Sequence, residues 1–116
     1  MRTPDNIEKN TTGGRRSIKA SFVTERISDT KLRQVTLSAT HSKERKAFFA
    51  SLTAETVERT DYGITTSFTL FSGKSVLGER VDRYSAKRLE EFFDRALALV
   101  TEDDIAELAA GEEIAA

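Results

Sequence analysis

The stretch "SAKRLEEFFDRALALV" at residues 85–100 determines the class of fold. Its apolar residues recur at spacings of three and four, which places them on one face of an α-helix. Ser85 suits the N-cap, because its hydroxyl can accept a hydrogen bond from a free amide of the first turn. The pattern predicts a helix over residues 86–100. Its apolar face consists of Leu89, Phe92, Phe93, Ala96, Leu97 and Val100.

Before Ser85 the sequence alternates between apolar and polar residues with period two, the pattern of strands with one buried face. Strands are expected at about 16–27, 32–41, 46–59, 64–71 and 75–84. The turns between them are short and include "SDTK" at 28–31, "RTDYG" at 59–63 and "SGK" at 72–74. Short turns favour a sequential antiparallel meander. The buried row is expected to contain Ile18, Ala20, Phe22, Val35, Leu37, Ala39, Phe48, Ala50, Leu52, Ala54, Ile64, Phe68 and Leu70.

The two ends of the chain have a different composition. Residues 1–14 contain the only proline and two adjacent glycines, and we expect a flexible arm there. Residues 15–100 then form the single domain. Residues 101–116, "TEDDIAELAAGEEIAA", predict a short acidic helix that begins at Thr101 and ends at Gly111. Its apolar face is thin, so this helix docks on the domain, docks on a second subunit, or frays.

The order of elements predicts an α+β fold: an antiparallel meander of about five strands, covered on one face by a C-terminal amphipathic helix, with a short helix at the end. One helix is thin cover for such a sheet. Its burial contributes on the order of 10 kcal/mol before the entropy of ordering the chain offsets most of that gain. We therefore expect a homodimer that packs sheets or helices together.

The amino-acid composition indicates the cellular compartment in which the protein is expected. The chain of 116 residues has no cysteine, which excludes a disulfide framework and a thiolate metal site and favours a cytosolic or intraviral protein. The first 15 residues are polar, and no stretch approaches the roughly 20 apolar residues that span a bilayer. We expect a cytoplasmic protein without membrane contact.

The net charge of −1 conceals an uneven distribution. Residues 15–47 hold nine Lys and Arg against three acids, whereas residues 48–116 hold seven bases against fourteen acids. Such a charge imbalance is evidence about binding partners rather than about the fold. An ordinary solvated surface explains it equally well.

The sequence carries no catalytic signature. His41 is the only histidine, without clustered carboxylates for a metal or a spaced relay for nucleophilic catalysis, so a structural or solvent-exposed role is the commoner one. Gly73-Lys74-Ser75 resembles the tail of a phosphate-binding loop but lacks the upstream glycine. The acids at 102–104 are more typical of a helix cap than of a cation site. We predict a protein that is not an enzyme and has no cofactor or metal.

The face opposite the buried row is rich in Ser and Thr and contains Phe49 and Phe71. Threonine is common on any solvated sheet, but solvation does not explain two phenylalanines on the same face. Basic residues fall in the same half of the chain: Lys19, Arg33, Lys43, Arg45 and Lys46. Aromatic rings stack on bases, cations track phosphates, and hydroxyls bond phosphate or sugar, so these seven residues form a candidate site for single-stranded nucleic acid. A protein-binding patch is the alternative.

A strand that runs straight into an amphipathic helix, "GERVDRYSAKRLEEFFDRALALV" at 78–100, resembles the Whirly and purine-rich-element-binding (Pur) proteins. In those families the last strand feeds a helix through a short capped turn, and repeats dimerise to present sheet surfaces to single strands. The resemblance covers residues 33–100 and implies single-stranded DNA or RNA as the ligand. No binding residue is carried over from it.

The lead hypothesis is a small binding protein that contacts single-stranded nucleic acid through the outer sheet face and the basic loop. The acidic segment 101–116 would then compete for that surface or recruit a partner. The alternative is a protein assembly or inhibitor module, of the kind found in phages and mobile elements. Both depend on the strand register, since a shift of one residue exchanges the two faces.

Overall fold

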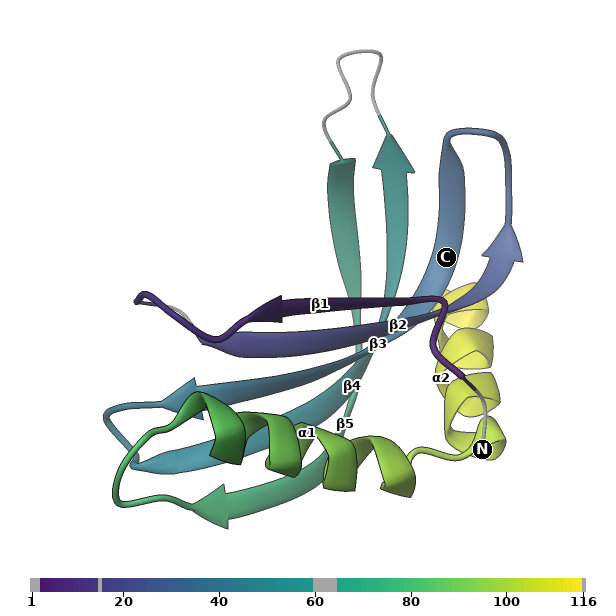
Figure 1. The fold of residues 1–116 in the computed structure, drawn as a ribbon. Helices are drawn as coiled ribbons and strands as arrows, with labels where there is room; N and C mark the ends of the chain where they lie inside the picture. The colour runs from purple at the N-terminus through teal and green to yellow at the C-terminus, as the bar shows by residue number, and fades with distance from the viewer. Residues whose placement is uncertain (1–2, 15, 60–64, 116) are drawn as a thin grey trace.

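The computed structural model of the chain describes residues 3–14, 16–59 and 65–115, and describes the backbone alone at residues 59, 65–72 and 111–115. Five strands form one antiparallel sheet in sequential order. They are β1 (Asn6–Asn10), β2 (Ser17–Arg26), β3 (Lys31–Ser42), β4 (Ala47–Arg59) and β5 (Thr65–Arg80). Helices α1 (Ala86–Leu99) and α2 (Glu102–Ala115) follow and run in different directions (Figure 1). The α+β meander predicted from the sequence is confirmed.

The core lies between one face of the sheet, here called the inner face, and the two helices. Alternate residues of β2, β3 and β4 point into it, as period-two patterning requires. The expected inner rows on these strands are confirmed, because Ile18, Ala20, Phe22, Val35, Leu37, Ala39, Phe48, Ala50, Leu52 and Ala54 are all buried. The side chains of Ile64, Phe68 and Leu70 lie outside the described residues.

Helix α1 is held by the cap and the face that its sequence predicts. The Ser85 hydroxyl accepts a hydrogen bond from the backbone amide of Arg88 at 3.1 Å. Leu89, Phe92, Phe93 and Ala96 are buried, and the ring of Phe92 lies 5.2 Å from that of Phe48 on β4. An aromatic pair at this distance stabilises the contact between helix and sheet beyond the area that it buries.

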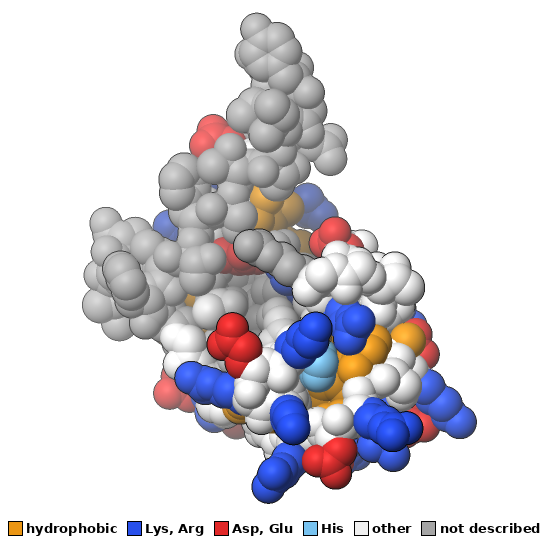
Figure 2. Space-filling view, turned by 90° about the vertical axis from the view of Figure 1, so that its left-hand side faces the viewer, with side chains coloured by type: hydrophobic (Ala, Val, Ile, Leu, Met, Phe, Trp, Pro, Cys, Tyr) orange, Lys and Arg blue, Asp and Glu red, His pale blue; other side chains and the backbone are white. Residues whose placement is uncertain are grey.

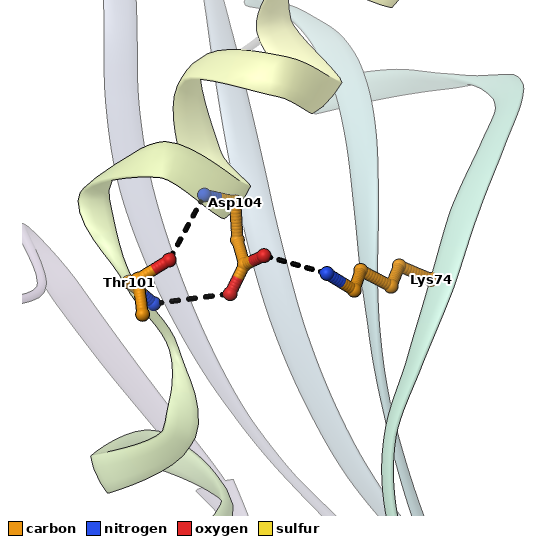
Figure 3. Close-up of polar contacts among 3 residues, drawn as sticks. All are labelled: Lys74, Thr101 and Asp104. Atoms are coloured by element: carbon orange, nitrogen blue, oxygen red, sulfur yellow. Dashed lines mark hydrogen bonds and ion pairs between the residues drawn. The ribbon is translucent and has the colours of Figure 1, made fainter.

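Helix α2 docks on the same core, since Ile105 and Leu108 are buried in it. Figure 3 shows its first turn, where the amide of Asp104 donates to the Thr101 hydroxyl at 3.1 Å and the Asp104 carboxylate accepts from the amide of Thr101 at 3.2 Å. The same carboxylate accepts from Nζ of Lys74 on β5 at 2.6 Å. Among the described residues, no helix is long and apolar enough to cross a membrane.

The expected end of the second helix at Gly111 is wrong. Helix α2 has 14 residues, as many as α1, and continues through this glycine to Ala115. A glycine inside a helix costs only about 1 kcal/mol relative to alanine. The neighbouring alanines and glutamates are strong helix formers, so one glycine does not stop the helix.

The arm expected at residues 1–14 contains a strand. β1 pairs with β2 from Asn6 opposite Ser21 to Asn10 opposite Ser17. All five residues of β1 are exposed, so this strand is held by backbone hydrogen bonds and by contacts at its ends. The Asp5 carboxylate accepts from the amide of Val23 at 2.7 Å. Without an apolar row to bury, β1 left no signal in the hydropathy pattern.

The tight turn expected at residues 72–74 is also wrong. One strand, β5, replaces the two expected at 64–71 and 75–84. Its pairing with β4 shifts at two places, between Ala50 and Ser51 and between Thr53 and Glu55. Bulges of this kind absorb extra residues without ending the strand. β5 is an edge strand of the sheet.

Candidate nucleic-acid interface

The face of the sheet that points away from the helices, here called the outer face, carries mostly small polar side chains. The register places Ser21, Thr36 and Thr53 in one row across β2, β3 and β4, and Lys19, Ser38 and Ser51 in the next. Both helices contribute their buried residues to the inner core. In the part of the chain that the structure describes, neither helix covers the outer face, and Lys19 and Ser51 are exposed on it.

Away from the β3–β4 turn, the outer face is hollowed into a groove of about 640 Å³. Glu55 lines it from β4, and its Oε1 accepts hydrogen bonds from Gln34 Nε2 at 2.7 Å and from Thr36 Oγ1 at 2.6 Å. Thr36 is only 6% exposed as a result of this crowding. The lining carries three carboxylates and two cations: Asp5, Glu8, Glu55, Lys19 and Arg26. This part of the face is therefore a poor track for phosphates.

The turn between β3 and β4 presents the opposite charge. Lys43, Arg45 and Lys46 are all exposed on it. The Ser42 hydroxyl accepts a hydrogen bond from the amide of Arg45 at 3.2 Å, and Lys46 takes a positive φ of 50°. These two features close a tight turn, which carries all three predicted cations.

Phe49 lies on the outer face immediately after this turn and is 39% exposed. The guanidinium of Arg45 lies over its ring, 5.7 Å from the ring centroid. Phe49 is paired with Thr40 on one side and with Gly78 on the other. Because glycine has no side chain, the β5 side of the ring stays uncovered by its cross-strand neighbour. An aromatic ring and a cation are thus placed together at the edge of a hydroxyl-rich face.

The structure places the remaining predicted site residues apart from this group. Lys19 shares the outer face but lies two strands from Phe49, about 10 Å across the sheet, and faces Glu8 on β1. Arg33 follows the inner-face alternation of β3 and pairs with Glu25 at 2.9 Å, so it does not join the site. The side chain of Phe71 lies outside the described residues.

A pocket at the same end of the molecule was not foreseen from the sequence. This sheet-end pocket has a volume of about 320 Å³ and is lined by Arg16, His41, Lys43, Lys46, Val81, Asp82 and Tyr84. Figure 2 shows this end of the molecule, where Lys and Arg side chains lie on several sides of the histidine and hydrophobic side chains adjoin it. The lining comes from three connections that are distant in sequence, so no local pattern marks it.

Tyr84 organises the pocket. The guanidinium of Arg16 lies 3.9 Å from the centroid of its ring, and the His41 ring lies 4.9 Å away. The Tyr84 hydroxyl donates to the carbonyl of Thr11 in the β1–β2 connection. His41 also contacts the buried ring of Phe48 at 5.6 Å. One tyrosine thus joins the start of β2, the end of β3 and the β5–α1 connection.

The electrostatics of the pocket act on His41. Burial and the positive charge of Arg16 lower the pKa of His41 from its ordinary value of 6.5. The imidazole is therefore mainly neutral at pH 7 and remains able to take up a proton if an anion enters. Among the described residues, no group of three His, Cys, Asp or Glu side chains is arranged to hold a metal.

Comparison with known proteins gives no relative for this chain: no protein-family model, no curated protein and no solved structure matches it.

Proposed function

We propose that the protein is a non-enzymatic binding protein for single-stranded DNA or RNA. The observation that carries this proposal is the exposed ring of Phe49 with the Arg45 guanidinium over it, next to Lys43 and Lys46 on a tight turn. We call these four residues the turn site. Phe49 and Arg45 lie at the end of the outer face, and Lys43 and Lys46 lie on the adjoining β3–β4 turn.

The chemistry of the turn site suits an unpaired nucleotide. A base stacked on Phe49 contributes roughly 1–3 kcal/mol, and this interaction requires no particular sequence. Arg45 adds a cation beside the ring, while Lys43 and Lys46 on the adjoining turn neutralise phosphates of the same strand. A base inside a duplex is already stacked between its neighbours, so the site favours single strands.

The hydroxyls next to the turn site extend the surface. Thr40 is exposed directly beside Phe49, and Ser38 and Ser51 form the next row with Lys19. Hydroxyl groups bond phosphate and sugar oxygens without reading the sequence. Away from the β3–β4 turn, the carboxylates of the outer groove repel phosphates. We therefore propose that the binding site is short.

We propose that the acidic helix does not compete for this surface, contrary to the expectation from the sequence. Ile105 and Leu108 place α2 on the inner face, whereas Phe49 lies on the outer one.

Two helices now cover the inner face, so the reason for expecting a homodimer no longer applies, and the oligomeric state stays a prediction. A protein partner at the same exposed ring remains the alternative function, as an assembly or inhibitor module.

Fluorescence anisotropy with a labelled single-stranded oligonucleotide at two salt concentrations tests the proposal. We expect binding in low salt that weakens in high salt, because phosphate contacts release counterions. Phe49→Ala should weaken binding more than Thr53→Ala, which changes the outer face without touching the turn site. Absence of binding in low salt would end the nucleic-acid proposal and favour the protein partner.

A further inference from the structure

The sheet-end pocket carries an excess of positive charge. Its lining contains the cations Arg16, Lys43 and Lys46 and one carboxylate, Asp82. Within the described residues, no carboxylate forms an ion pair with either lysine. Like charges gathered around a hollow disfavour one another, and an anion inside it relieves that repulsion.

Part of the pocket wall is held in place by contacts among its side chains and backbone. Arg16 is fixed twice, since its guanidinium stacks on Tyr84 and its Nε donates to the carbonyl of Gly13 at 3.2 Å. The amide of His41 donates to the carbonyl of Arg16 at 3.2 Å, which holds the two residues together. A volume of about 320 Å³ is ample for one phosphate group.

The β3–β4 turn separates this pocket from Phe49. His41 follows the inner-face alternation of β3 and is paired with Phe48, whereas Phe49 points to the outer face. Arg45 lies over Phe49, while Lys43 and Lys46 line the pocket. A strand stacked on Phe49 and passing over the turn would bring a phosphate to the pocket.

We propose that the sheet-end pocket binds one phosphate group, held by Arg16, Lys43 and Lys46, and that His41 takes up a proton from the solvent when the phosphate enters. The pocket itself needs no nucleic acid, but the assignment of the phosphate to a nucleic-acid strand rests on the proposed function. The groups that face His41 are Arg16, Lys43, Lys46, Asp82 and Tyr84. The four charged groups among them leave a net positive field, which a bound anion would weaken.

The sign of the proton linkage follows from these neighbours. In the free protein, burial and Arg16 lower the pKa of His41, so the ring stays neutral at pH 7. A bound anion raises that pKa, because it favours the charged imidazolium. Affinity for the anion therefore rises as the pH falls, and levels off once His41 is protonated in the free protein as well.

Because the chain has one histidine, its ring signals report on this pocket alone in an NMR titration. We would follow them against pH in sodium sulfate, an anion of phosphate shape, and in sodium chloride at equal ionic strength. We expect the His41 midpoint to lie about one pH unit higher in sulfate. Lys43→Gln should reduce this shift, whereas Lys31→Gln, at the other end of β3, should leave it unchanged.

Identical His41 midpoints in sulfate and chloride would overturn the pocket proposal. Oligonucleotides with and without a 5′-phosphate then identify the source. A shift with both assigns the pocket to a backbone phosphate, and a shift with the phosphorylated strand alone assigns it to a terminal one. If oligonucleotides bind through Phe49 while sulfate leaves His41 unchanged, the pocket fails and the proposed function stands. If sulfate shifts His41 but no oligonucleotide binds, the pocket stands and the proposed function fails.

Discussion

Asp104 and Lys74, thirty residues apart in sequence, join α2 to β5 through a contact of 2.6 Å between carboxylate and ammonium. The same carboxylate accepts a hydrogen bond from the amide of Thr101 and so also caps the first turn of the helix. One acid therefore both caps α2 and holds it against the edge strand of the sheet (Figure 3).

This contact predicts a dependence of stability on pH. The hydrogen bonds from Lys74 and Thr101 lower the pKa of Asp104 below 3.8, and the hydrogen bond to Asp104 raises the pKa of Lys74 above 10.5. The stabilisation that this contact gives to the folded protein is therefore complete at pH values between 3.8 and 10.5. It is lost as the pH falls through the lowered pKa of Asp104, and also as the pH rises through the raised pKa of Lys74.

The measurement is urea unfolding of the parent and of Asp104→Asn from neutral pH down to pH about 2. We expect the variant to be less stable at pH 7 and the difference to shrink below the ordinary carboxyl pKa. Asp103→Asn is the matched control, since it removes an exposed acid from the same first turn. Equal losses in the two variants would contradict the role of Asp104.

The docking of α2 gives a second prediction. Leu108 is 8% exposed, whereas Leu99 at the end of α1 is 53% exposed. Leu108→Ala should cost about 2–5 kcal/mol in the free energy of unfolding, because it removes apolar contacts from the core. Leu99→Ala should stay within about 0.5 kcal/mol of the parent. Similar effects in chemical denaturation would mean that α2 does not belong to the core.

Thr36 provides a third prediction, on the outer face. Its hydroxyl donates to the Glu55 carboxylate at 2.6 Å and is nearly buried. Thr36→Val keeps the shape but removes the donor, and we expect a loss of about 1.5–3 kcal/mol, the range for a hydrogen bond to a charged group. Thr53→Val, its cross-strand partner, is the control. Urea midpoints that move equally for both would contradict the assignment.

Some elements of this fold could be predicted from the sequence and others could not. The inner rows and α1 were predictable, because burial imposes an apolar repeat that is read directly, as at Phe48, Ala50 and Leu52. β1 was not, since a fully exposed edge strand such as Asn6–Asn10 needs only backbone partners. The long β5 was split at Gly73 because a bulge and a turn share the same residue types.

The candidate site was predictable only in part for a similar reason. The cations Lys43, Arg45 and Lys46 and the ring of Phe49 are neighbours in sequence, so their proximity could be expected. Arg33 was assigned by its place in the chain, but strand alternation turns it to the other face. Arg16, His41 and Tyr84 meet only because the meander brings three connections to one end, which no local pattern reveals.

The cations of the turn site give a fourth prediction, for the salt dependence of binding. Lys43→Gln should weaken oligonucleotide binding for all sequences and reduce the slope of log affinity against log salt by about 1. Lys31→Gln removes the same charge at the far end of β3 and should leave the slope unchanged. Equal slopes for the parent and Lys43→Gln would show that Lys43 contacts no phosphate.

Stacking of a base on residue 49 can be measured by fluorescence, because the chain has no tryptophan of its own. In a Phe49→Trp variant the single indole reports stacking by fluorescence quenching, since a base that binds must lie on that ring. We predict saturable quenching by a single-stranded oligonucleotide, at the concentrations that raise its anisotropy, and much weaker quenching by the matching duplex. Oligonucleotide binding that leaves the indole fluorescence unchanged would contradict the proposed role of the turn site.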